Sequence, residues 1–295
     1  MLEIKEVRKS FGDKEVLHGL SFQVAPGRIV GLVGKNGAGK TTLFHSILKF
    51  VQFTGEITFN GKVVTQETFA QIGYLPEERS LMPKLTVGDQ VAYLAELKGM
   101  KRSEVAKALP VWMERLQVKG RVTDKIKSLS KGNQQKVQLI ATLIHQPDLI
   151  ILDEPFSGLD PVNAGLLKQV ILEEKARGAS IIFSDHVMMD VEEICDDLII
   201  LRDGEIALAG TVQEVRLSYG RTRLFVSSDK SQEELAALPH VEAVSRTKQD
   251  TWRLILDDEQ AGPELFQLLS GGHYIQTFDQ QPPTIDEIFK LIAEA

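Results

Sequence analysis

Residues 34–42 read Gly34-Lys35-Asn36-Gly37-Ala38-Gly39-Lys40-Thr41-Thr42. They fit the phosphate-binding pattern G-x-x-x-x-G-K-[ST], between an apolar run suited to a buried strand (28–33) and a predicted helix (41–49). The glycines allow backbone N–H groups to curl around phosphate oxygens, and the start of the helix adds a favourable dipole. We expect Lys40 to reach the β- and γ-phosphates of a bound nucleotide and the Thr41 hydroxyl to bind Mg²⁺.

A second stretch is an apolar run that ends in two acids, and it reads Leu149-Ile150-Ile151-Leu152-Asp153-Glu154. A buried strand can end in carboxylates at low cost if a cation meets them there. We expect Asp153 to hold Mg²⁺, mostly through water, and Glu154 to polarise the attacking water. Alone, the run is also compatible with a strand whose end is solvated. Because this run follows a phosphate-binding loop along the chain, the two together predict a P-loop nucleoside triphosphatase.

Three further segments decide between families of such enzymes. They read Leu129-Ser130-Lys131-Gly132-Asn133-Gln134-Gln135-Lys136, Ser157-Gly158-Leu159-Asp160 and Phe183-Ser184-Asp185-His186. The first resembles the signature motif of ABC ATPases, usually LSGGQ, the second their D-loop, and the third contains their switch histidine. The resemblance runs from about Leu2 to Gly220 and keeps the order of the family's motifs. It implies two nucleotide domains that pair head to tail, with each ATP held between one phosphate-binding loop and the partner's signature motif.

The resemblance also assigns a role to each residue that contacts the partner or its nucleotide. Ser130 would cap the helix continued by residues 134–144, whose N-terminus receives a phosphate from the second molecule. Gly132 would let that backbone approach closely, and Asp160 would tie the D-loop to the facing subunit.

Two more residues take roles in the chain's own nucleotide site. His186 would sense the γ-phosphate and steady the attacking water together with Glu154. Phe11 occupies the position whose aromatic ring stacks on adenine in the family, although ordinary core packing is the alternative for this residue.

Three positions depart from the family's pattern. Lys131 replaces the first glycine of the signature motif and Asn133 replaces its glutamine, which implies a working but altered γ-phosphate contact. Glu77 lies where the family has the glutamine of its Q-loop. A carboxylate can still ligate Mg²⁺ or water. It also adds negative charge near the triphosphate, from which we expect pH-sensitive hydrolysis.

The pattern along the chain predicts an α/β fold. A hairpin at Asn60-Gly61 adds antiparallel strands to the phosphate-binding core. Apolar residues at helical spacing, among them Val87, Val91, Leu94 and Leu97, predict a helical subdomain at about 86–129. Strands and helices then alternate. The predicted elements are strand 149–152, helix 164–177, strand 180–183, helix 187–195 and strand 198–201.

The C-terminal part of the chain shows a separate pattern of predicted strands and helices. Short runs predict strands near 224–226, 241–244, 252–256 and 274–278, and helices near 232–238, 263–269 and 285–292. The order β-α-β-β-α-β predicts a small ferredoxin-like α+β domain. We therefore expect an ABC ATP-binding domain over residues 1–220 and a small C-terminal domain over residues 221–295.

Composition limits the functional classes. The net charge of −7 and the pI near 5.5 give no electrostatic reason to expect nucleic-acid binding. Cys195 is the only cysteine, so no internal disulfide can form, which fits a reducing cytosol. The N-terminus has no apolar signal-peptide core, and no apolar run is long enough to cross a bilayer. A transport role would therefore require a membrane permease on another chain.

The resemblance extends to bacterial ABC-2 exporter ATPases of the sodium-extrusion-like, YhaQ-type group. It rests on the Leu-Pro-Glu-Glu-Arg stretch at 75–79, the LSKGN variant, the C-terminal domain and the segment 283–289. It implies a homodimer on the cytoplasmic face of the plasma membrane, bound to an ABC-2 type permease. The permease's coupling helix would enter a groove beside the helical subdomain, for which the candidate residues are Tyr74, Arg79, Leu81, Met82 and Lys84.

Two other readings stay open at this point. Soluble ABC ATPases assemble iron–sulfur clusters, remodel ribosomes or act on DNA. The single phosphate-binding loop and the lack of room for a long coiled coil favour neither of the last two, while the cluster-assembly class would leave the C-terminal domain unexplained. A regulator that binds nucleotide without hydrolysing it is disfavoured by the complete set Asp153, Glu154 and His186.

Overall fold

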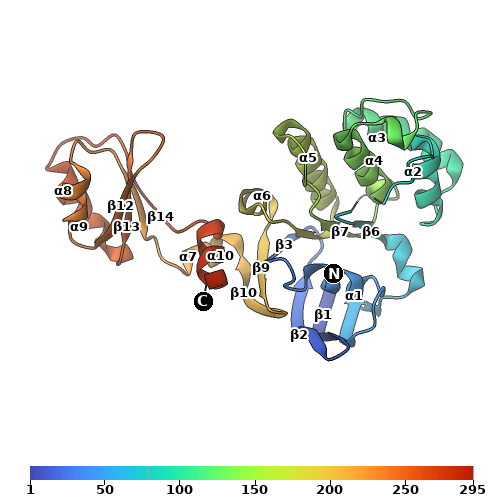
Figure 1. Ribbon diagram of the computed structural model, residues 1–295, viewed down its shortest axis with the longest axis horizontal. Coiled ribbons are helices and arrows are strands. Elements are labelled where there is room, and N and C mark those ends of the chain that lie inside the picture. The colour runs from blue at the N-terminus through green and yellow to red at the C-terminus, as the bar shows by residue number, and fades with distance from the viewer. Residues whose placement is uncertain (79, 295) are drawn as a thin grey trace. The chain divides into compact units, whose positions relative to one another are not determined.

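The computed structural model describes residues 1–78 and 80–294. The chain divides into two compact units, Met1–Ala209 and Gly210–Ala295. The first contains two β-sheets and most of the helices, and the second contains one β-sheet with its own helices (Figure 1).

The centre of the first unit is a six-stranded sheet with the order β10-β9-β3-β8-β7-β6. Its strands are β3 (Ile29–Gly34), β6 (Ile72–Leu75), β7 (Leu149–Asp153), β8 (Ser180–Ser184), β9 (Asp197–Arg202) and β10 (Glu205–Thr211). From β9 to β6 the neighbours run parallel, and β3, β7 and β8 are buried along their whole length. Parallel strands covered on both faces require continuous apolar runs, and this is the pattern from which the strands were predicted.

A smaller antiparallel sheet has the order β2-β1-β4-β5. Its strands are β1 (Leu2–Phe11), β2 (Lys14–Val24), β4 (Thr54–Phe59) and β5 (Lys62–Val63). Asn60 and Gly61 take φ values of 52° and 74° between β4 and β5, which confirms the predicted hairpin. One hydrophobic core joins both sheets through Leu2 of β1, Phe44 of α1 (Lys40–Ile47) and Ile151 of β7.

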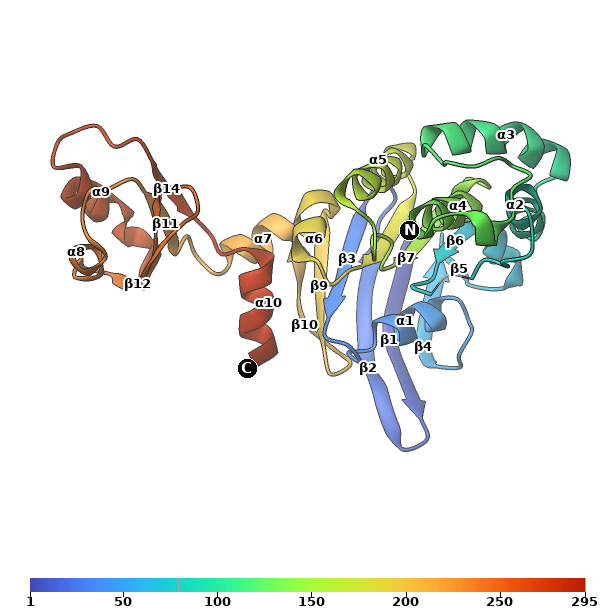
Figure 2. The same cartoon turned by 45° about the horizontal axis from the view of Figure 1, so that its top comes forward.

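Helices inserted between β6 and β7 lie together beside that edge of the sheet (Figure 2). They are α2 (Val87–Glu96), α3 (Arg102–Arg115), η2 (Ile126–Ser128) and α4 (Lys131–Leu143). Val87 and Val91 are buried at helical spacing, as predicted. Leu97 is 66% exposed, so the prediction that it continues this apolar stripe is wrong. The reason is that α2 ends at Glu96, and Leu97 is only its C-cap.

The remaining elements of the first unit are η1 (Gln66–Gln71), α5 (Pro161–Arg177) and α6 (Met188–Ile194). α5 begins earlier than the predicted start at Ala164. The Asp160 carboxylate accepts a hydrogen bond from the backbone N–H of Asn163, and proline suits the first helical position.

The second unit contains an antiparallel sheet with the order β12-β13-β11-β14. Its elements are α7 (Val212–Leu217), β11 (Arg223–Val226), α8 (Gln232–Ala236), β12 (Val241–Arg246), β13 (Trp252–Leu256), η3 (Glu259–Ala261), α9 (Gly262–Ser270), β14 (Phe278–Gln281) and α10 (Ile285–Glu294). This order and the chain sequence of the elements agree with the expected ferredoxin-like arrangement. The last strand begins at Phe278 instead of Tyr274, because Phe278 pairs with Val226 while Tyr274 is 90% exposed.

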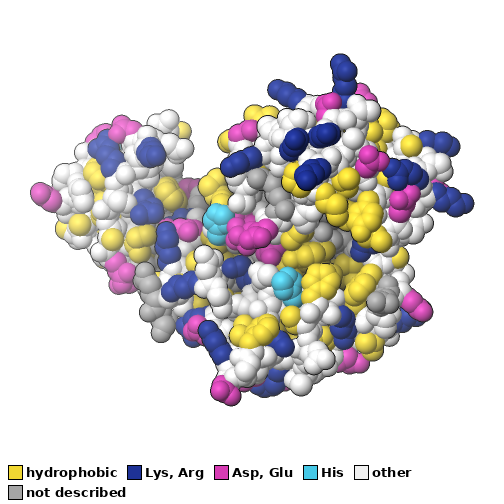
Figure 3. Space-filling model, turned by 45° about the vertical axis from the view of Figure 1, so that its right-hand side comes forward, with side chains coloured by type: hydrophobic (Ala, Val, Ile, Leu, Met, Phe, Trp, Pro, Cys, Tyr) yellow, Lys and Arg dark blue, Asp and Glu magenta, His cyan; other side chains and the backbone are white. Residues whose placement is uncertain are grey.

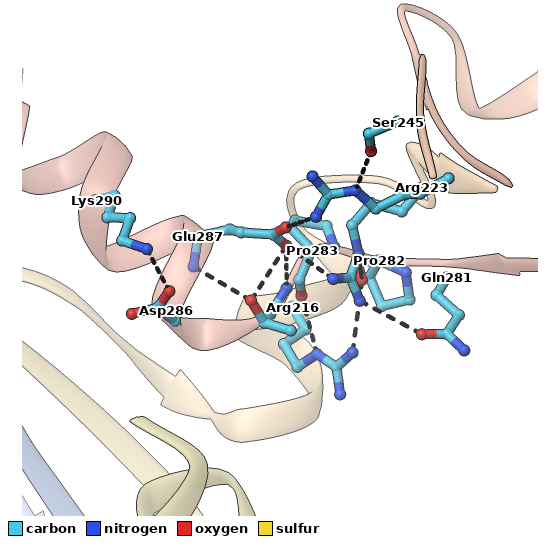
Figure 4. A network of polar contacts seen from close by, with 11 residues as sticks. Arg216, Arg223, Ser245, Gln281, Pro282, Pro283, Asp286, Glu287 and Lys290 are labelled. Atoms are coloured by element: carbon cyan, nitrogen blue, oxygen red, sulfur yellow. Dashed lines mark hydrogen bonds and ion pairs between the residues drawn. The ribbon is translucent and has the colours of Figure 1, made fainter. Parts of the chain in front are cut away.

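The boundary between the units lies before α7, whereas the sequence placed it near Gly220. The difference arises because α7 contacts α10 within the second unit. Figure 4 shows the polar network beside this contact, in which Arg216 Nε donates to the Pro283 carbonyl oxygen at 3.0 Å. Glu287 on α10 pairs with the guanidinium groups of Arg223, at 2.9 Å, and Arg253, at 3.3 Å.

Candidate functional site

A cleft of about 490 Å³ in the first unit brings most of the predicted site residues together. It is lined by Phe11, Val16, Asn36, Gly37, Gly39, Lys40, Thr41, Thr42, Glu77, Asp153 and Glu154. The loops after β3, β6 and β7 meet here because parallel strands end at the same edge of a sheet. Residues far apart in the sequence therefore share one site.

The phosphate-binding loop enters α1 through a left-handed glycine. Gly39 has φ 106°, and a Cβ atom there would lie 2.8 Å from Leu17 Cδ2. Lys40 is only 8% exposed, and its Nζ donates to the Gly34 carbonyl oxygen at 2.7 Å. Burial lowers the pKa of Lys40, while the carboxylates of Glu154, Asp153 and Glu77 oppose this shift. The ammonium group thus lies in the loop, close to where phosphate oxygens would bind.

Asp153 is buried and is held by two hydroxyl groups. Ser184 Oγ donates to Asp153 Oδ1 at 2.5 Å, and Thr41 Oγ1 donates to Asp153 Oδ2 at 3.2 Å. Burial raises the pKa of Asp153, and these two hydrogen bonds oppose the rise. A threonine hydroxyl beside an aspartate carboxylate is an oxygen donor set that fits Mg²⁺.

Glu154 and His186 lie in contact at the edge of the cleft. Glu154 has φ 49°, a left-handed conformation that non-glycine residues rarely adopt, and its N–H donates to the Ser184 carbonyl oxygen at 3.1 Å. Its Oε2 lies 3.2 Å from His186 Nδ1. The Asp185 carboxylate accepts hydrogen bonds from the backbone N–H groups of His186 and Val187 and so fixes this turn. Figure 3 shows acidic side chains gathered beside a histidine on one face of the molecule.

Glu77 follows β6 and turns towards the cleft that it lines. The carbonyl oxygen of the preceding residue, Pro76, accepts a hydrogen bond from Gln138 Nε2 of α4 at 3.4 Å. Partial burial raises the pKa of Glu77, and the negative charges of Glu154 and Asp153 raise it further.

Ser130, Gly132 and Asp160 are among the predicted residues that do not line this cleft. Ser130 caps α4, and its Oγ accepts hydrogen bonds from the Asn133 backbone N–H at 3.4 Å and from Asn133 Nδ2 at 2.9 Å. A Cβ atom on Gly132 would lie 3.7 Å from Leu159 Cδ2 and from Asn163 Nδ2, so the signature and D-loop segments are neighbours. The chain therefore gathers these three residues, called the signature surface below, in a place of their own.

Comparison with known proteins identifies the family. Residues 17–157 match the ABC transporter family, and residues 210–293 match the C-terminal domain of DrrA1-3-like ATP-binding proteins. The chain is 42% identical over 292 residues to the ABC transporter ATP-binding protein YhaQ of Bacillus subtilis, covering 98% of this chain and 97% of that protein. The chain belongs to the ABC transporter ATP-binding proteins.

Other members of the family support the same assignment. The Nod factor export ATP-binding protein I of Rhizobium meliloti is 30% identical over 304 residues, covering 98% of this chain and 86% of that protein. A solved ATP-binding subunit of an ABC transporter superposes with a TM-score of 0.70 at 32% identity, covering 74% of this chain and 92% of that structure. The chain is thus an ATP-binding subunit of an ABC transporter, from a family that hydrolyses ATP to drive transport.

Phe11 is 51% exposed and lines the cleft, so it is not a core residue. Lys9 Nζ lies 4.5 Å from the centre of its ring. Of the predicted residues lining no part of the cleft, Gly34, Lys35 and Ala38 belong to the same loop, and Gly34 and Lys35 offer carbonyl oxygens to Lys40 Nζ.

A second cleft, of about 310 Å³, lies between α2, α4 and β6. Tyr74 lines it, and burial lowers the pKa of His145, on its wall, to about 4. The other candidates for a permease groove do not line it: Leu81 is buried, while Met82 and Lys84 are exposed. Arg79 lies outside the described residues.

Sequence reasoning missed three side chains that hold the site. Ser184 was quoted only as part of a motif, yet it bonds Asp153. Gln135 of α4 is buried, and its Nε2 donates to the Pro155 carbonyl oxygen at 3.0 Å. With Gln138 on Pro76, α4 thus holds the backbone next to Glu154 and next to Glu77. No helix of the described residues is long and apolar enough to span a bilayer.

Proposed function

We propose that this chain is the ATP-hydrolysing subunit of an exporter, and that it acts as a homodimer bound to an ABC-2 type membrane permease. One observation carries the ATPase part: Lys40, Thr41, Asp153 and Glu154 line a single cleft, with His186 in contact with Glu154. The name of the relative that exports Nod factor and the DrrA-like second unit support export.

The residues of the cleft divide the work of hydrolysis. Backbone N–H groups at Gly37 and Gly39 and the Lys40 ammonium group would bind the phosphates and stabilise charge that builds up during transfer. Glu154 would orient the attacking water and draw its proton, and His186 would hold the Glu154 carboxylate in place and reach the γ-phosphate.

Thr41 and Asp153 would hold Mg²⁺, with Glu77 as a further oxygen donor. Bound there, the ion would neutralise charge on the transferring phosphate. Ser184 would keep the Asp153 carboxylate oriented, since its hydroxyl group occupies the oxygen that Thr41 does not.

The signature surface would complete the site of a second copy. Ser130 and Asp160 are exposed, and within the described part of the chain their side chains bond inside their own helix caps, so their remaining polar capacity is open to a partner. The helix N-terminus at Ser130 suits the γ-phosphate of a nucleotide held by the other chain. Closing the dimer around two nucleotides and reopening it after hydrolysis would move two permease subunits.

The permease would be a multi-span membrane protein that places this chain on the cytoplasmic face of the plasma membrane. The second cleft, between α2, α4 and β6, would receive a short segment of that permease. One near full-length relative is named an ABC transporter ATP-binding protein and another a Nod factor export ATP-binding protein. Both names favour this proposal over a soluble ABC ATPase such as a cluster-assembly factor.

The experiment is purification of the tagged chain from detergent-solubilised native membranes. We expect a multi-span membrane protein in near-equal amount, and less of it with Leu97→Glu, because Leu97 lines the second cleft and is 66% exposed. Val63→Glu, on β5 and 52% exposed, does not line the second cleft, so it serves as a matched control and should leave recovery unchanged. Recovery only in the soluble fraction, with cytosolic partners, would contradict the transporter proposal.

A further inference from the structure

Glu77 puts an additional negative charge into the nucleotide cleft. Where the ABC family has a neutral glutamine, this chain has a carboxylate of similar length, two residues beyond the end of β6. Its side chain lines the same cleft as the phosphate-binding loop. The backbone before it is held by the hydrogen bond from Gln138 Nε2 to the Pro76 carbonyl oxygen. The backbone that carries this carboxylate is therefore held by the fold.

Glu77 makes the charge balance of the cleft more negative. Among its described lining residues, Glu77, Asp153 and Glu154 are acidic and Lys40 alone is basic, three negative charges against one positive. A glutamine at position 77 would leave two against one. The three carboxylates do not form a ready metal-binding cluster within the described part of the chain. The third charge therefore acts on the nucleotide and on any ion that enters the cleft with it.

We infer that Glu77 makes nucleotide binding conditional on the divalent cation, so that the cleft selects the magnesium complex of ATP over free ATP. A free nucleoside triphosphate carries about four negative charges and its magnesium complex about two, so a nearby carboxylate repels the free form about twice as strongly. Glu77 can also offer an oxygen to the ion of the complex, and free ATP has no ion to accept it. This inference rests on the proposed ATPase function of the same cleft.

Neither of the other two carboxylates can supply this selectivity without changing the chemistry. Asp153 is bonded to Thr41 and Ser184, and Glu154 contacts His186, so each already has a structural task in the cleft. Glu77 has no such tie among its described contacts and differs from the family's residue by charge alone. Its replacement by glutamine thus removes the charge while keeping the shape.

The test measures binding of a fluorescent, non-hydrolysable ATP analogue to the full chain, once with excess Mg²⁺ and once with EDTA. In Glu77→Gln we expect the preference for the magnesium complex to fall about tenfold, mostly because free nucleotide binds more tightly. Glu77→Asp, which keeps the charge, should retain most of the preference. Glu78→Gln is the matched control, since Glu78 carries the same charge next door but does not line the cleft. Added salt should shrink the difference.

The outcomes distinguish failure of this inference from failure of the proposed ATPase function. An unchanged ratio of the two affinities in Glu77→Gln would overturn the inference, and so would an equal change in Glu78→Gln, because the effect would then be one of general surface charge. If the wild-type chain binds the analogue under neither condition, the proposed ATPase function fails instead, and this result is distinct from the first two.

Discussion

The nucleotide cleft and the signature surface differ in how their side chains are held. In the cleft, Lys40 and Asp153 are 8% and 2% exposed, and Asp153 is bonded from α1 and β8. On the signature surface, Ser130 and Asp160 are exposed, and each bonds an asparagine of its own helix cap. A buried group that is bonded by several elements of its own chain acts within that chain. An exposed helix cap, in contrast, is accessible to a second chain. Binding should therefore depend on the cleft alone, and hydrolysis on both.

The largest effect is expected from Lys40→Met. It removes the ammonium group from the loop, so both nucleotide binding and ATPase activity should fall by more than about 100-fold. Binding by fluorescence and phosphate release would measure it. Lys49→Met, at an exposed lysine just beyond α1, is the control and should change neither quantity by more than about twofold.

Ser130→Arg should separate the two regions. Because Ser130 lies outside the cleft, nucleotide binding to the single chain should stay within about twofold, while ATPase activity falls about 100-fold through loss of the dimer.

A mixture of two inactive variants tests directly whether the site is shared between chains. Combining equal amounts of the Lys40→Met and Ser130→Arg chains creates mixed dimers with one intact composite site, so part of the activity should return. Two inactive variants that stay inactive together would argue against a site shared between chains.

Ser184→Ala should have a moderate effect that arises in the cleft only. It removes a hydrogen bond to the Asp153 carboxylate, worth about 1–1.5 kcal/mol, or about tenfold in Mg²⁺ dependence. Titration of ATPase activity with Mg²⁺ measures it. Asn133→Ala, which removes the amide bonded to Ser130, should lower activity without moving the Mg²⁺ midpoint. A shifted midpoint in both variants would show that the two regions are not separable.

The smallest effect concerns pH. The pKa of Glu77 is raised above that of an ordinary carboxyl group, first by burial and then by Glu154 and Asp153. As the pH falls through this raised value, Glu77 gains a proton and comes to resemble glutamine. The ATPase profiles of wild type and Glu77→Gln should therefore differ at neutral pH and converge on the acidic side. Superimposable profiles would contradict the predicted role of this charge.

The cleft could be predicted from the sequence because its motifs are local and the ends of parallel strands meet. A glycine-rich loop before a helix, or an apolar run before Asp153, fixes its own geometry over a few residues. The role of Ser184 could not be predicted in this way. It depends on the register that pairs Asp153 with Ser184 across β7 and β8, and no local pattern encodes a register.

Tertiary packing also determines the element and unit boundaries that the sequence pattern predicted imprecisely. The first residue of α5 follows from the Asp160 cap, which was recognised only as part of the D-loop. The start of β14 depends on its pairing with β11, and the unit boundary depends on the contact of α7 with α10. Such contacts join segments far apart in the chain, which hydrophobic periodicity does not report.

Glu154→Gln shows most directly whether Glu154 is the catalytic base and whether ATP joins two chains. The substitution keeps the shape of the cleft but removes the base, so ATP should bind without being hydrolysed and hold two chains together. Size-exclusion chromatography with light scattering, with and without Mg²⁺ and ATP, reads out the state. We expect a dimer that appears only with ATP and persists, together with an ATPase rate at least about 100-fold below wild type. Hydrolysis at the wild-type rate, or a chain that stays monomeric with ATP, would contradict this expectation.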